Sequence, residues 1–399
     1  MNIVKRCYCR TFQRCFYLVS CFLQWRRPEI LDKLEQVPEL FKEQDIKDVL
    51  LVTDKGIRSL GLADGLLEGL AAAGINCTVY DGTVPNPTID NVEEGLKLFN
   101  DKGCKGIIAF GGGSSMDCAK IIGARAVKPN KTVPQLKGLL KVGKKLPFFV
   151  AVPTTAGTGS ETTVAALVSN SKTHEKYAIN DLVLIPQYAV LDASITLKLP
   201  PHITSTTGID ALTHAVESYI GSGNTGETKE LSRDAVKLIF ENLKTAYDEG
   251  TNIEARKNML YASFYAGAAF TRAYVGYVHA VAHTLGGFYS VPHGLANAVL
   301  LPYLLKIYGK TAEKRLAELA DVIGIAASAS VPEKAAAFIA AIEELNAYMK
   351  IPTDFDVIKE EDIALMASRA SKEANPLYPV PKLMDAKELE NVYRSVMRK

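Results

Sequence analysis

Histidine and aspartate residues recur in two short segments at a spacing that could bind a metal. Asp210 and His214 are four residues apart, so a helix would carry both on one face. His279 and His283 have the same spacing, and His293 follows them closely. Imidazole and carboxylate groups together suit a divalent transition metal. The alternative is a set of unrelated core histidines bonded to the backbone, but the paired spacing favours a metal site.

The chain must turn back for His293 to reach the other histidines. Gly286 and Gly287 are expected to end the helix that carries His279 and to return His293 toward it. The surrounding residues are small and apolar, and buried imidazole rings are costly there without a partner.

A glycine triplet follows an apolar strand and opens a helix. In the stretch from Ile107 to Asp117, the triplet Gly111-Gly112-Gly113 lets the backbone approach a ligand. The start of the next helix offers free N–H groups and a positive dipole end, which together predict a pyrophosphate site. Any tight strand-to-helix turn can use glycines, however, and the GxGxxG fingerprint is absent, so that fold type is not predicted.

A second loop and an aspartate are expected at the same edge of the sheet. The loop Pro153–Glu161 is rich in glycine and hydroxyl groups and follows another strand, and Asp54 follows an earlier one. Ligands of open parallel sheets bind at the carboxyl ends of the strands, where an acid can accept both ribose hydroxyls of an adenosine. Asp54 is equally suited to cap a helix N-terminus.

The first half of the chain alternates strand-like and helix-like segments, which predicts a parallel sheet with helices on both faces. The expected strands are 48–53, 76–80, 106–110 and 148–152, and the expected helices are 57–73, 90–101 and 115–127.

Past about residue 205 the segments become long, Ala-rich and periodic, as in 234–247, 253–273 and 312–327. We expect an α/β fold with an N-terminal dinucleotide-binding domain over 28–204, an all-helical metal-binding domain over 205–399, and an N-terminal extension over 1–27. Pro200-Pro201 lies close to the expected boundary between the two domains.

Composition limits the class of protein. The 399 residues are enough for two domains, 48% of them are hydrophobic, and a net charge of +2 gives no reason to expect nucleic acid as a partner. Seven cysteines, an odd number, fit free thiols in a reducing cytoplasm rather than a disulfide scaffold. Four of them lie at Cys7, Cys9, Cys15 and Cys21, but no pair has the CxxC spacing of a metal cluster.

Residues 1–27 combine cations with an apolar stretch, Cys15–Trp25, that is too short to span a bilayer. No small-residue cleavage site follows Arg26 and Arg27, so a secretion signal is not expected. Phe12, Phe16, Val19 and Phe22 or Leu23 recur at helical spacing. We expect an amphipathic helix whose apolar face the rest of the protein or a dimer partner covers, and no membrane partner; a basic helix on a membrane surface is the alternative.

Six segments resemble the iron-containing alcohol dehydrogenases in order and spacing, over roughly residues 28 to 395. They are VTDKG (52–56), VPNPT (84–88), GGGSSMD (111–117), PTTAGTGSE (153–161), GIDALTHAVESYI (208–220) and GYVHAVAHTLGGFYSVPHGLAN (276–297). The resemblance implies a dehydroquinate synthase-like fold, with the active site in the cleft between an α/β domain and a helical domain. It also implies a homodimer or larger assembly.

The resemblance assigns roles to individual residues. The implied metal ligands are Asp210, His214, His279 and His293, holding Fe²⁺ or Zn²⁺, and His283 matches a catalytic histidine near the metal that is not a ligand. The implied contacts to NAD are Asp54, Asn86, Gly112, Gly113, Ser114, Asp117, Thr154, Thr155 and Lys176.

The expected reaction is hydride transfer between a small alcohol or aldehyde and NAD(H). Relatives in the wider superfamily, a glycerol-type dehydrogenase or a dehydroquinate synthase-like lyase, are the alternatives. A synthase would need several Lys and Arg for its acidic substrate, whereas the segments around the expected ligands carry Ala, Val, Leu, Phe and Tyr. A non-catalytic metal- or nucleotide-binding protein is the other alternative, against which the complete ligand set argues.

Overall fold

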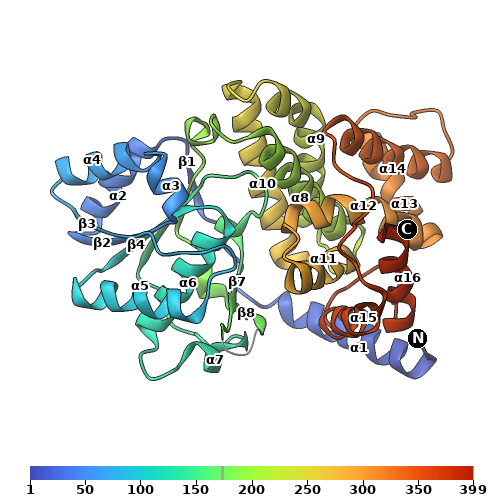
Figure 1. Cartoon of the computed structure of the whole chain (residues 1–399), viewed down its shortest axis with the longest axis horizontal. Helices are drawn as coiled ribbons and strands as arrows, with labels where there is room; N and C mark the ends of the chain where they lie inside the picture. Colours follow the sequence, from blue (N-terminus) through green and yellow to red (C-terminus); the bar gives the residue numbers. More distant parts are fainter. Residues whose placement is uncertain (172–174, 399) are drawn as a thin grey trace. The chain divides into compact units, whose positions relative to one another are not determined.

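The computed structural model describes residues 1–171 and 175–398, which form two compact units. One unit is Gln24–Lys198, and the other joins Met1–Leu23 to Leu199–Lys399. The first 23 residues therefore belong with the helical half of the chain. Figure 1 shows the strands and helices of each unit along the chain.

The unit Gln24–Lys198 is built on a six-stranded parallel sheet, which confirms the predicted fold class. Its strands, in spatial order, are β1 (Glu29–Leu31), β9 (Tyr188–Val190), β6 (Phe148–Pro153), β4 (Gly106–Gly111), β2 (Asp48–Val52) and β3 (Asn76–Tyr80). Every neighbouring pair is parallel, as in the register Leu51 to Ile108.

Helices cover both faces of this sheet because its strands are apolar on both sides. In β2, Leu50 and Val52 pack toward one core, whereas Val49 and Leu51 pack toward the other. The first core includes α5 (Ile89–Asp101) and α6 (Gly113–Val127); the second includes α2 (Val37–Glu43), α3 (Lys55–Ser59) and α4 (Asp64–Ala72). Figure 1 shows these two groups on opposite sides of the sheet.

Two features of this unit differ from the sequence prediction. The helix expected over 57–73 is divided into α3 and α4, because Gly61 adopts a left-handed φ of +66° that interrupts the helix. A second sheet was not expected: β5 (Gly138–Leu139), β8 (Lys176–Asn180) and β7 (Ala165–Ser169) form it, with β7 and β8 antiparallel, and α7 (Val133–Leu136) precedes it.

The other unit is built from helices. They are α1 (Ile3–Ser20), α8 (Pro201–Ile220), α9 (Gly226–Asp248), α10 (Ile253–Ala273), α11 (Tyr277–Tyr289), α12 (His293–Tyr308), α13 (Glu313–Val322), α14 (Val331–Tyr348), α15 (Glu360–Ala374) and α16 (Ala386–Val396). The buried helix α8 packs against α9, α10 and α12, and α11 packs against α12 and α15. Pro201 begins α8, where its missing N–H costs nothing.

The glycine pair does not end α11, so this part of the prediction is wrong. The helix continues through Gly286 and Gly287 to Tyr289, and the Ser290 N–H still donates to the Gly286 carbonyl at 3.1 Å. Each helical glycine costs only about 1 kcal/mol relative to alanine, which the burial of residues such as Leu285 offsets. The turn comes instead at Ser290, whose φ is +56°, and α12 then begins at His293.

Candidate metal and cofactor sites

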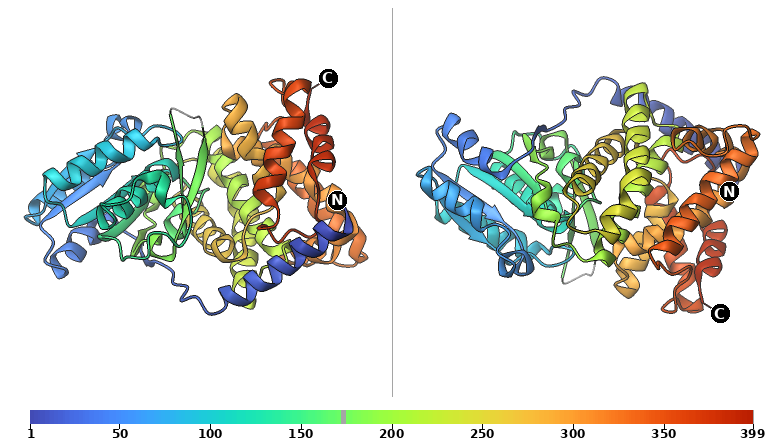
Figure 2. Two further views of the ribbon diagram at one scale, coloured as in Figure 1. Left: turned by 90° about the horizontal axis from the view of Figure 1, so that it is seen from below. Right: turned by 90° about the horizontal axis from the view of Figure 1, so that it is seen from above.

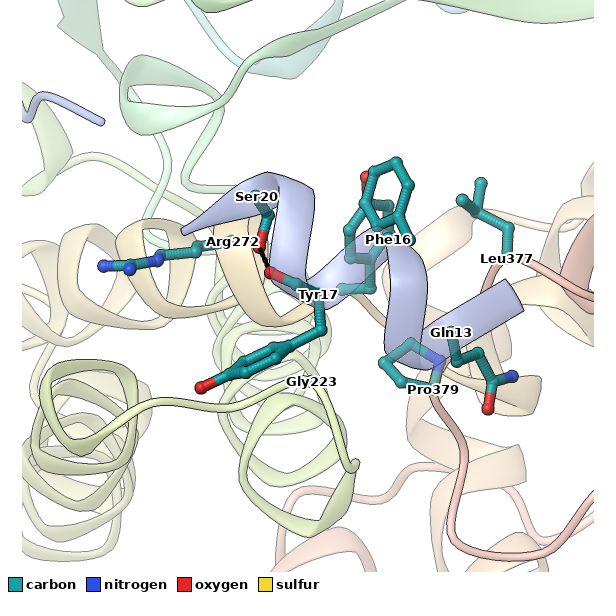
Figure 3. Close-up of a pocket in the computed structure, with 9 residues that line it drawn as sticks. Gln13, Phe16, Tyr17, Ser20, Gly223, Arg272, Leu377 and Pro379 are labelled. Carbon is teal, nitrogen blue, oxygen red and sulfur yellow. Dashed lines mark hydrogen bonds between the residues drawn. The ribbon is translucent and has the colours of Figure 1, made fainter. Parts of the chain in front are cut away.

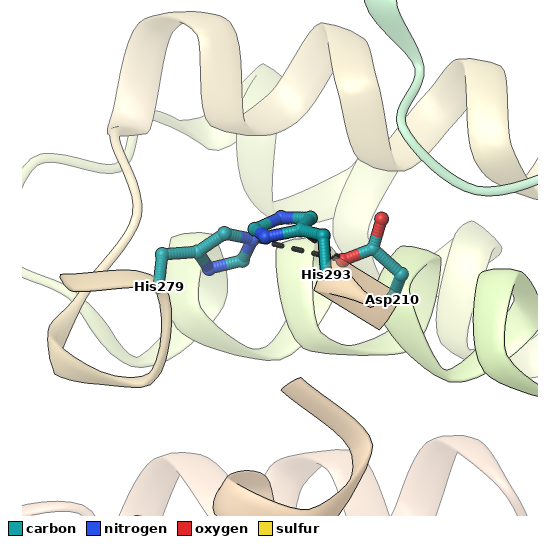
Figure 4. Close-up of side chains that lie close together, drawn as sticks. All are labelled: Asp210, His279 and His293. Carbon is teal, nitrogen blue, oxygen red and sulfur yellow. Dashed lines mark ion pairs between the residues drawn. The ribbon is translucent and has the colours of Figure 1, made fainter. Parts of the chain in front are cut away.

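Three of the four predicted metal ligands converge within the helical unit. Asp210 lies on α8, His279 on α11 and His293 at the first turn of α12, and their ligand atoms all lie within 4.8 Å of one another. Asp210 Oδ1 is 3.9 Å from His279 Nε2 and 3.6 Å from His293 Nε2. Figure 4 shows the two rings and the carboxylate directed toward one another.

The chemistry of this cluster fits a bound cation. Two atoms that each lie about 2.0–2.2 Å from one ion are roughly 3–4 Å apart, as these are. The amide nitrogen of Asn297 lies 2.6 Å from Asp210 Oδ1 and 3.2 Å from each of the two Nε2 atoms. Three acceptor atoms are thus aimed at one small region, and a bound cation would compensate the charge of the buried Asp210 carboxylate.

His214 lies beside this cluster but outside the three-residue group. It is on α8, one turn after Asp210, and its ring stacks on His279 with centroids 4.4 Å apart and on Phe270 at 4.2 Å. Its role as the fourth ligand remains a prediction.

Glu217 is a residue of this site that the sequence reasoning missed. Its buried carboxylate accepts hydrogen bonds from the N–H groups of Gly276 and Val278, each at 2.8 Å, and lies 2.7 Å from His279 Nδ1. It therefore caps α11 and orients the His279 ring so that Nε2 faces Asp210. Its position one turn beyond His214 on the same face of α8 was the available signal.

Burial controls the charge of this site. It lowers the pKa of His279 well below the ordinary value, with smaller contributions from the neighbouring histidines, so the ring is neutral and able to ligate. Burial also raises the pKa of Glu217 to about 7, against the opposing effect of its three hydrogen-bond donors.

His283 lies one turn after His279 on α11 and has its own acidic partner. Its Nδ1 is 2.7 Å from Glu373 Oε1, and the Tyr378 hydroxyl donates to the same oxygen at 2.9 Å. The His283 and His293 rings stack with centroids 5.2 Å apart. Glu373 thus orients His283 with its Nε2 left for other contacts.

In the α/β unit, Asp54 and the glycine triplet lie at the carboxyl ends of the neighbouring strands β2 and β4. After β2 the chain continues to β3, which lies next to β2 on one side of the sheet. After β4 it continues to β6, which lies next to β4 on the opposite side, so the strand order reverses between β2 and β4. Asp54 follows β2, and the glycine triplet follows β4. Such a reversal is the usual place for a nucleotide in an open parallel sheet.

The glycine loop lies close to the second loop. Gly113 begins α6, and a side chain at Gly112 or Gly113 would come close to Thr155 or Thr158. The Thr154 N–H donates to the Gly111 carbonyl at 3.1 Å. The start of a helix at such a turn is a position that can bind a ligand's negative charge.

The other predicted cofactor residues are also located by the structure. Asn86, with a left-handed φ of +57°, donates through its N–H to Ser114 Oγ at 3.3 Å and accepts from Lys176 Nζ at 2.7 Å. Asp54 caps α3 by accepting from the Ile57 N–H at 3.0 Å, as the alternative interpretation of this residue expected.

Asp117 and Lys120 secure the second loop to α6. The Asp117 carboxylate accepts from Ser160 Oγ at 2.9 Å and from the Leu167 N–H at 3.1 Å. Lys120, which the sequence reasoning missed, is fully buried and donates to the carbonyls of Ser160, Thr163 and Ala165 at 2.6, 2.8 and 3.0 Å. The position of the 153–163 loop therefore depends on a buried ammonium, whose pKa burial lowers to about 8.

The sequence matches two family descriptions that together span both units. Residues 31–193 match "Iron-containing alcohol dehydrogenase", and residues 204–397 match "Fe-containing alcohol dehydrogenase family, C-terminal". This chain belongs to the iron-containing alcohol dehydrogenase family. The predicted resemblance is confirmed.

Named relatives and solved structures agree with this membership. The 1,3-propanediol dehydrogenase of Citrobacter freundii is 40% identical over 353 residues, covering 87% of this chain and 91% of that protein. The NAD-dependent methanol dehydrogenase of Bacillus methanolicus is 35% identical over 340 residues, covering 84% and 89%. A crystal structure of 1,3-propanediol oxidoreductase superposes with a TM-score of 0.91 at 36% identity, covering 94% of this chain and 100% of that one.

Membership in the iron-containing alcohol dehydrogenase family determines the class of reaction. The protein is an oxidoreductase of the alcohol dehydrogenase class, as predicted, and the lyase alternative is not favoured.

Proposed function

We propose that this protein transfers hydride between a small alcohol or aldehyde and NAD(H), with one divalent metal held by Asp210, His214, His279 and His293. The observation that carries the proposal is the convergence of Asp210 with the two imidazole Nε2 atoms in a member of this family. Iron is the expected metal, and zinc suits the same nitrogen and oxygen donors.

When bound, the metal supplies Lewis acidity toward the substrate oxygen. Asp210 provides negative charge that compensates the cation, and Glu217 keeps the His279 ring in the ligating tautomer. His283, oriented by Glu373, would exchange a proton with the substrate hydroxyl through Nε2.

The pyrophosphate of NAD is expected to lie on Gly112, Gly113 and Ser114 at the start of α6. Thr154 and Thr155 of the neighbouring loop, with Asn86 and Lys176, would contact the dinucleotide, and Asp117 would hold that loop in place.

The decisive experiment measures metal and turnover together. Protein purified without oxygen should contain one metal ion per chain, and absorbance at the NADH band should report turnover with a panel of short alcohols and aldehydes. Turnover that is lost on chelation and recovered with Fe²⁺ or Zn²⁺ supports the proposal. Metal-free protein with full turnover would contradict it.

We predict a preference for NAD over NADP. A 2′-phosphate beside Asp54 meets like-charge repulsion of about 4 kcal/mol at 4 Å for an effective dielectric of 20, which solvent reduces. We expect kcat/KM to favour NAD on the order of 100-fold, and Asp54→Asn to narrow that ratio while its amide oxygen still caps α3. Equal kcat/KM for both cofactors in the unmodified enzyme would refute the assignment.

We predict that His283→Gln lowers turnover without loss of metal. General acid–base catalysis contributes about 10²–10⁴-fold, and we expect a smaller loss because water or the ribose hydroxyl can substitute. Metal content, melting temperature and turnover should be measured on the same preparation.

The three possible roles of His283 give different results in that experiment. If His283 is a metal ligand, the variant will contain less metal. If His283 only packs in the helical unit, the variant will be less stable, while its folded fraction turns over normally. Glu373→Gln should lower turnover in the same direction but less, because it removes only the orienting charge.

For assembly and location, we propose a homodimer or larger homo-oligomer in the cytoplasm. The family resemblance supports the assembly. All seven cysteines lie in the described part of the chain and are free, which suits a reducing compartment. Sedimentation analysis and the location of a tagged chain would test these two points.

A further inference from the structure

Polar side chains anchor the inward side of α1. Its buried residues are Cys9, Gln13 and Ser20. Gln13 Nε2 donates to the carbonyls of Pro376 and Tyr378 at 3.1 and 2.8 Å. Arg10 donates to the carbonyls of Val380 and Pro381 at 2.8 and 2.9 Å. α1 is thus held chiefly through backbone carbonyls of the segment 376–381.

Some apolar side chains of α1 do pack on the helical unit. Phe16 meets Tyr274 edge-on with ring centroids 5.5 Å apart, and Phe12 is half-buried. Figure 3 shows Phe16, Tyr17, Ser20 and Gln13 lining a small pocket with Arg272, Leu377 and Pro379. This pocket marks the inward side of α1.

The outward face of α1 is apolar. Val4 and Leu18 share one face of α1 by helical spacing and are 78% and 61% exposed, and Phe22, in the turn just after α1, is 88% exposed. Ile3, Tyr8 and Val19 are exposed beside them, as are Cys7 and Cys15. We expected the rest of the protein or a dimer partner to cover the apolar face of residues 1–27. Within a single chain Val19 and Phe22 stay exposed, because polar groups that bind carbonyls take part of the inward side.

Cations border this apolar face. Residues 1–27 contain Lys5, Arg6, Arg10, Arg14, Arg26 and Arg27, and no Asp or Glu. Lys5, Arg6 and Arg14 are exposed on α1 itself. An apolar stripe flanked by cations is the pattern of a helix that lies in the interface of an anionic membrane, with its apolar side chains about 5–10 Å deep.

We propose that α1 is a membrane-surface helix that attaches this enzyme to anionic lipid bilayers. The outward face of α1, comprising Val4, Cys7, Thr11, Cys15 and Leu18, would enter the headgroup region together with Phe22 from the following turn, and Lys5, Arg6 and Arg14 would contact lipid phosphates. Among the described residues, none of the helices is long and apolar enough to cross a bilayer, so the attachment is peripheral.

A second copy of this chain fits the face less well. In a symmetric dimer the same patch meets itself, so cations would oppose cations with no acid in the segment to pair with them. Anionic lipid supplies the opposite charge, worth about fivefold in binding for each cation near the surface.

The test is co-sedimentation of the full-length protein, kept in reductant, with vesicles of phosphatidylcholine alone or with one third phosphatidylserine. We expect binding to the anionic vesicles only, and its loss between 0.1 and 1 M salt, where the screening length falls from about 10 to about 3 Å. Leu18→Glu with Phe22→Glu should reduce vesicle binding at least about tenfold. Because both side chains are exposed, aldehyde reduction should be unchanged, which shows that the variant is folded.

The matched control is Val331→Glu with Leu365→Glu, which adds the same charge at other exposed apolar positions of this unit and should bind vesicles normally. Arg6→Glu with Arg14→Glu tests the cations separately and should also abolish binding. Absence of binding by the unmodified chain, or equal loss in the control, overturns the proposal. So does a dimer that Leu18→Glu with Phe22→Glu converts to monomer in the absence of any vesicle binding.

Discussion

Replacing His279 by alanine is expected to remove the bound metal and to lower turnover by three or more orders of magnitude. The Lewis acid contributes several kcal/mol to the transition state, and each 1.36 kcal/mol corresponds to about a factor of ten. His279 is the central member of the cluster, since its Nε2 faces Asp210 and its Nδ1 faces Glu217. Metal per chain should be measured by elemental analysis beside turnover with NADH and an aldehyde.

The control is His202→Ala, which removes an exposed histidine from α8, the helix that also carries Asp210. It should keep both metal and turnover. The fold of the His279 variant should survive, because the loss of one buried ring leaves the packing of α11 on α12 and α15 in place. If the His279 variant keeps stoichiometric metal and normal turnover, the assignment of this cluster is wrong.

Glu217→Ala should weaken metal binding by about 10–100-fold and lower the free energy of unfolding by roughly 1–3 kcal/mol. Two causes combine: His279 loses the acceptor that orients its ring, and the N–H groups of Gly276 and Val278 lose their buried partner. Metal titration of the apoprotein and thermal unfolding, each performed on the same sample, measure the two effects separately.

A purely structural role for Glu217 would change unfolding but not metal affinity at a temperature where the variant is folded. Excess metal should restore part of the turnover only if the residue acts through His279. Glu217→Gln, which retains an acceptor oxygen, should recover most of the stability. Glu318→Ala is the matched control, since that acid accepts from Tyr219 on α8 outside the cluster and should leave metal affinity unchanged.

Residues close in sequence could be predicted well. The four-residue spacing of Asp210 and His214 places them on one face of whatever helix forms, because that spacing is close to one helical turn. The alternation of apolar runs and helical periods predicted the strands β2, β4 and β6, because a strand buried on both faces reads as a continuous apolar run, and it also predicted the edge strand β3. The Gly-rich turn before α6 could also be predicted, because it depends only on residues that are adjacent in the sequence.

Contacts between residues far apart in the sequence could not be predicted in this way. In the sequence Glu217 and Lys120 resemble ordinary helix residues. Only the structure shows that Glu217 binds the start of α11 and that Lys120 binds the 153–163 loop. The short edge strand β1, which pairs with β9 across most of the α/β unit's sequence, carries too few residues to show a period.

The sequence by itself predicted a donor set and determined the parallel α/β architecture and the family, since these depend on residue type and local spacing. Tertiary structure decided which side of a helix is covered. The periodicity predicted an apolar face that included Phe12 and Phe16; the structure packs these two rings beside Gln13, which binds carbonyls of 376–381, and leaves Val4 and Leu18 exposed. Likewise Ser290, rather than the glycine pair, makes the turn before His293. In both cases the free energy of long-range hydrogen bonds and burial exceeds the local preference of about 1 kcal/mol per residue.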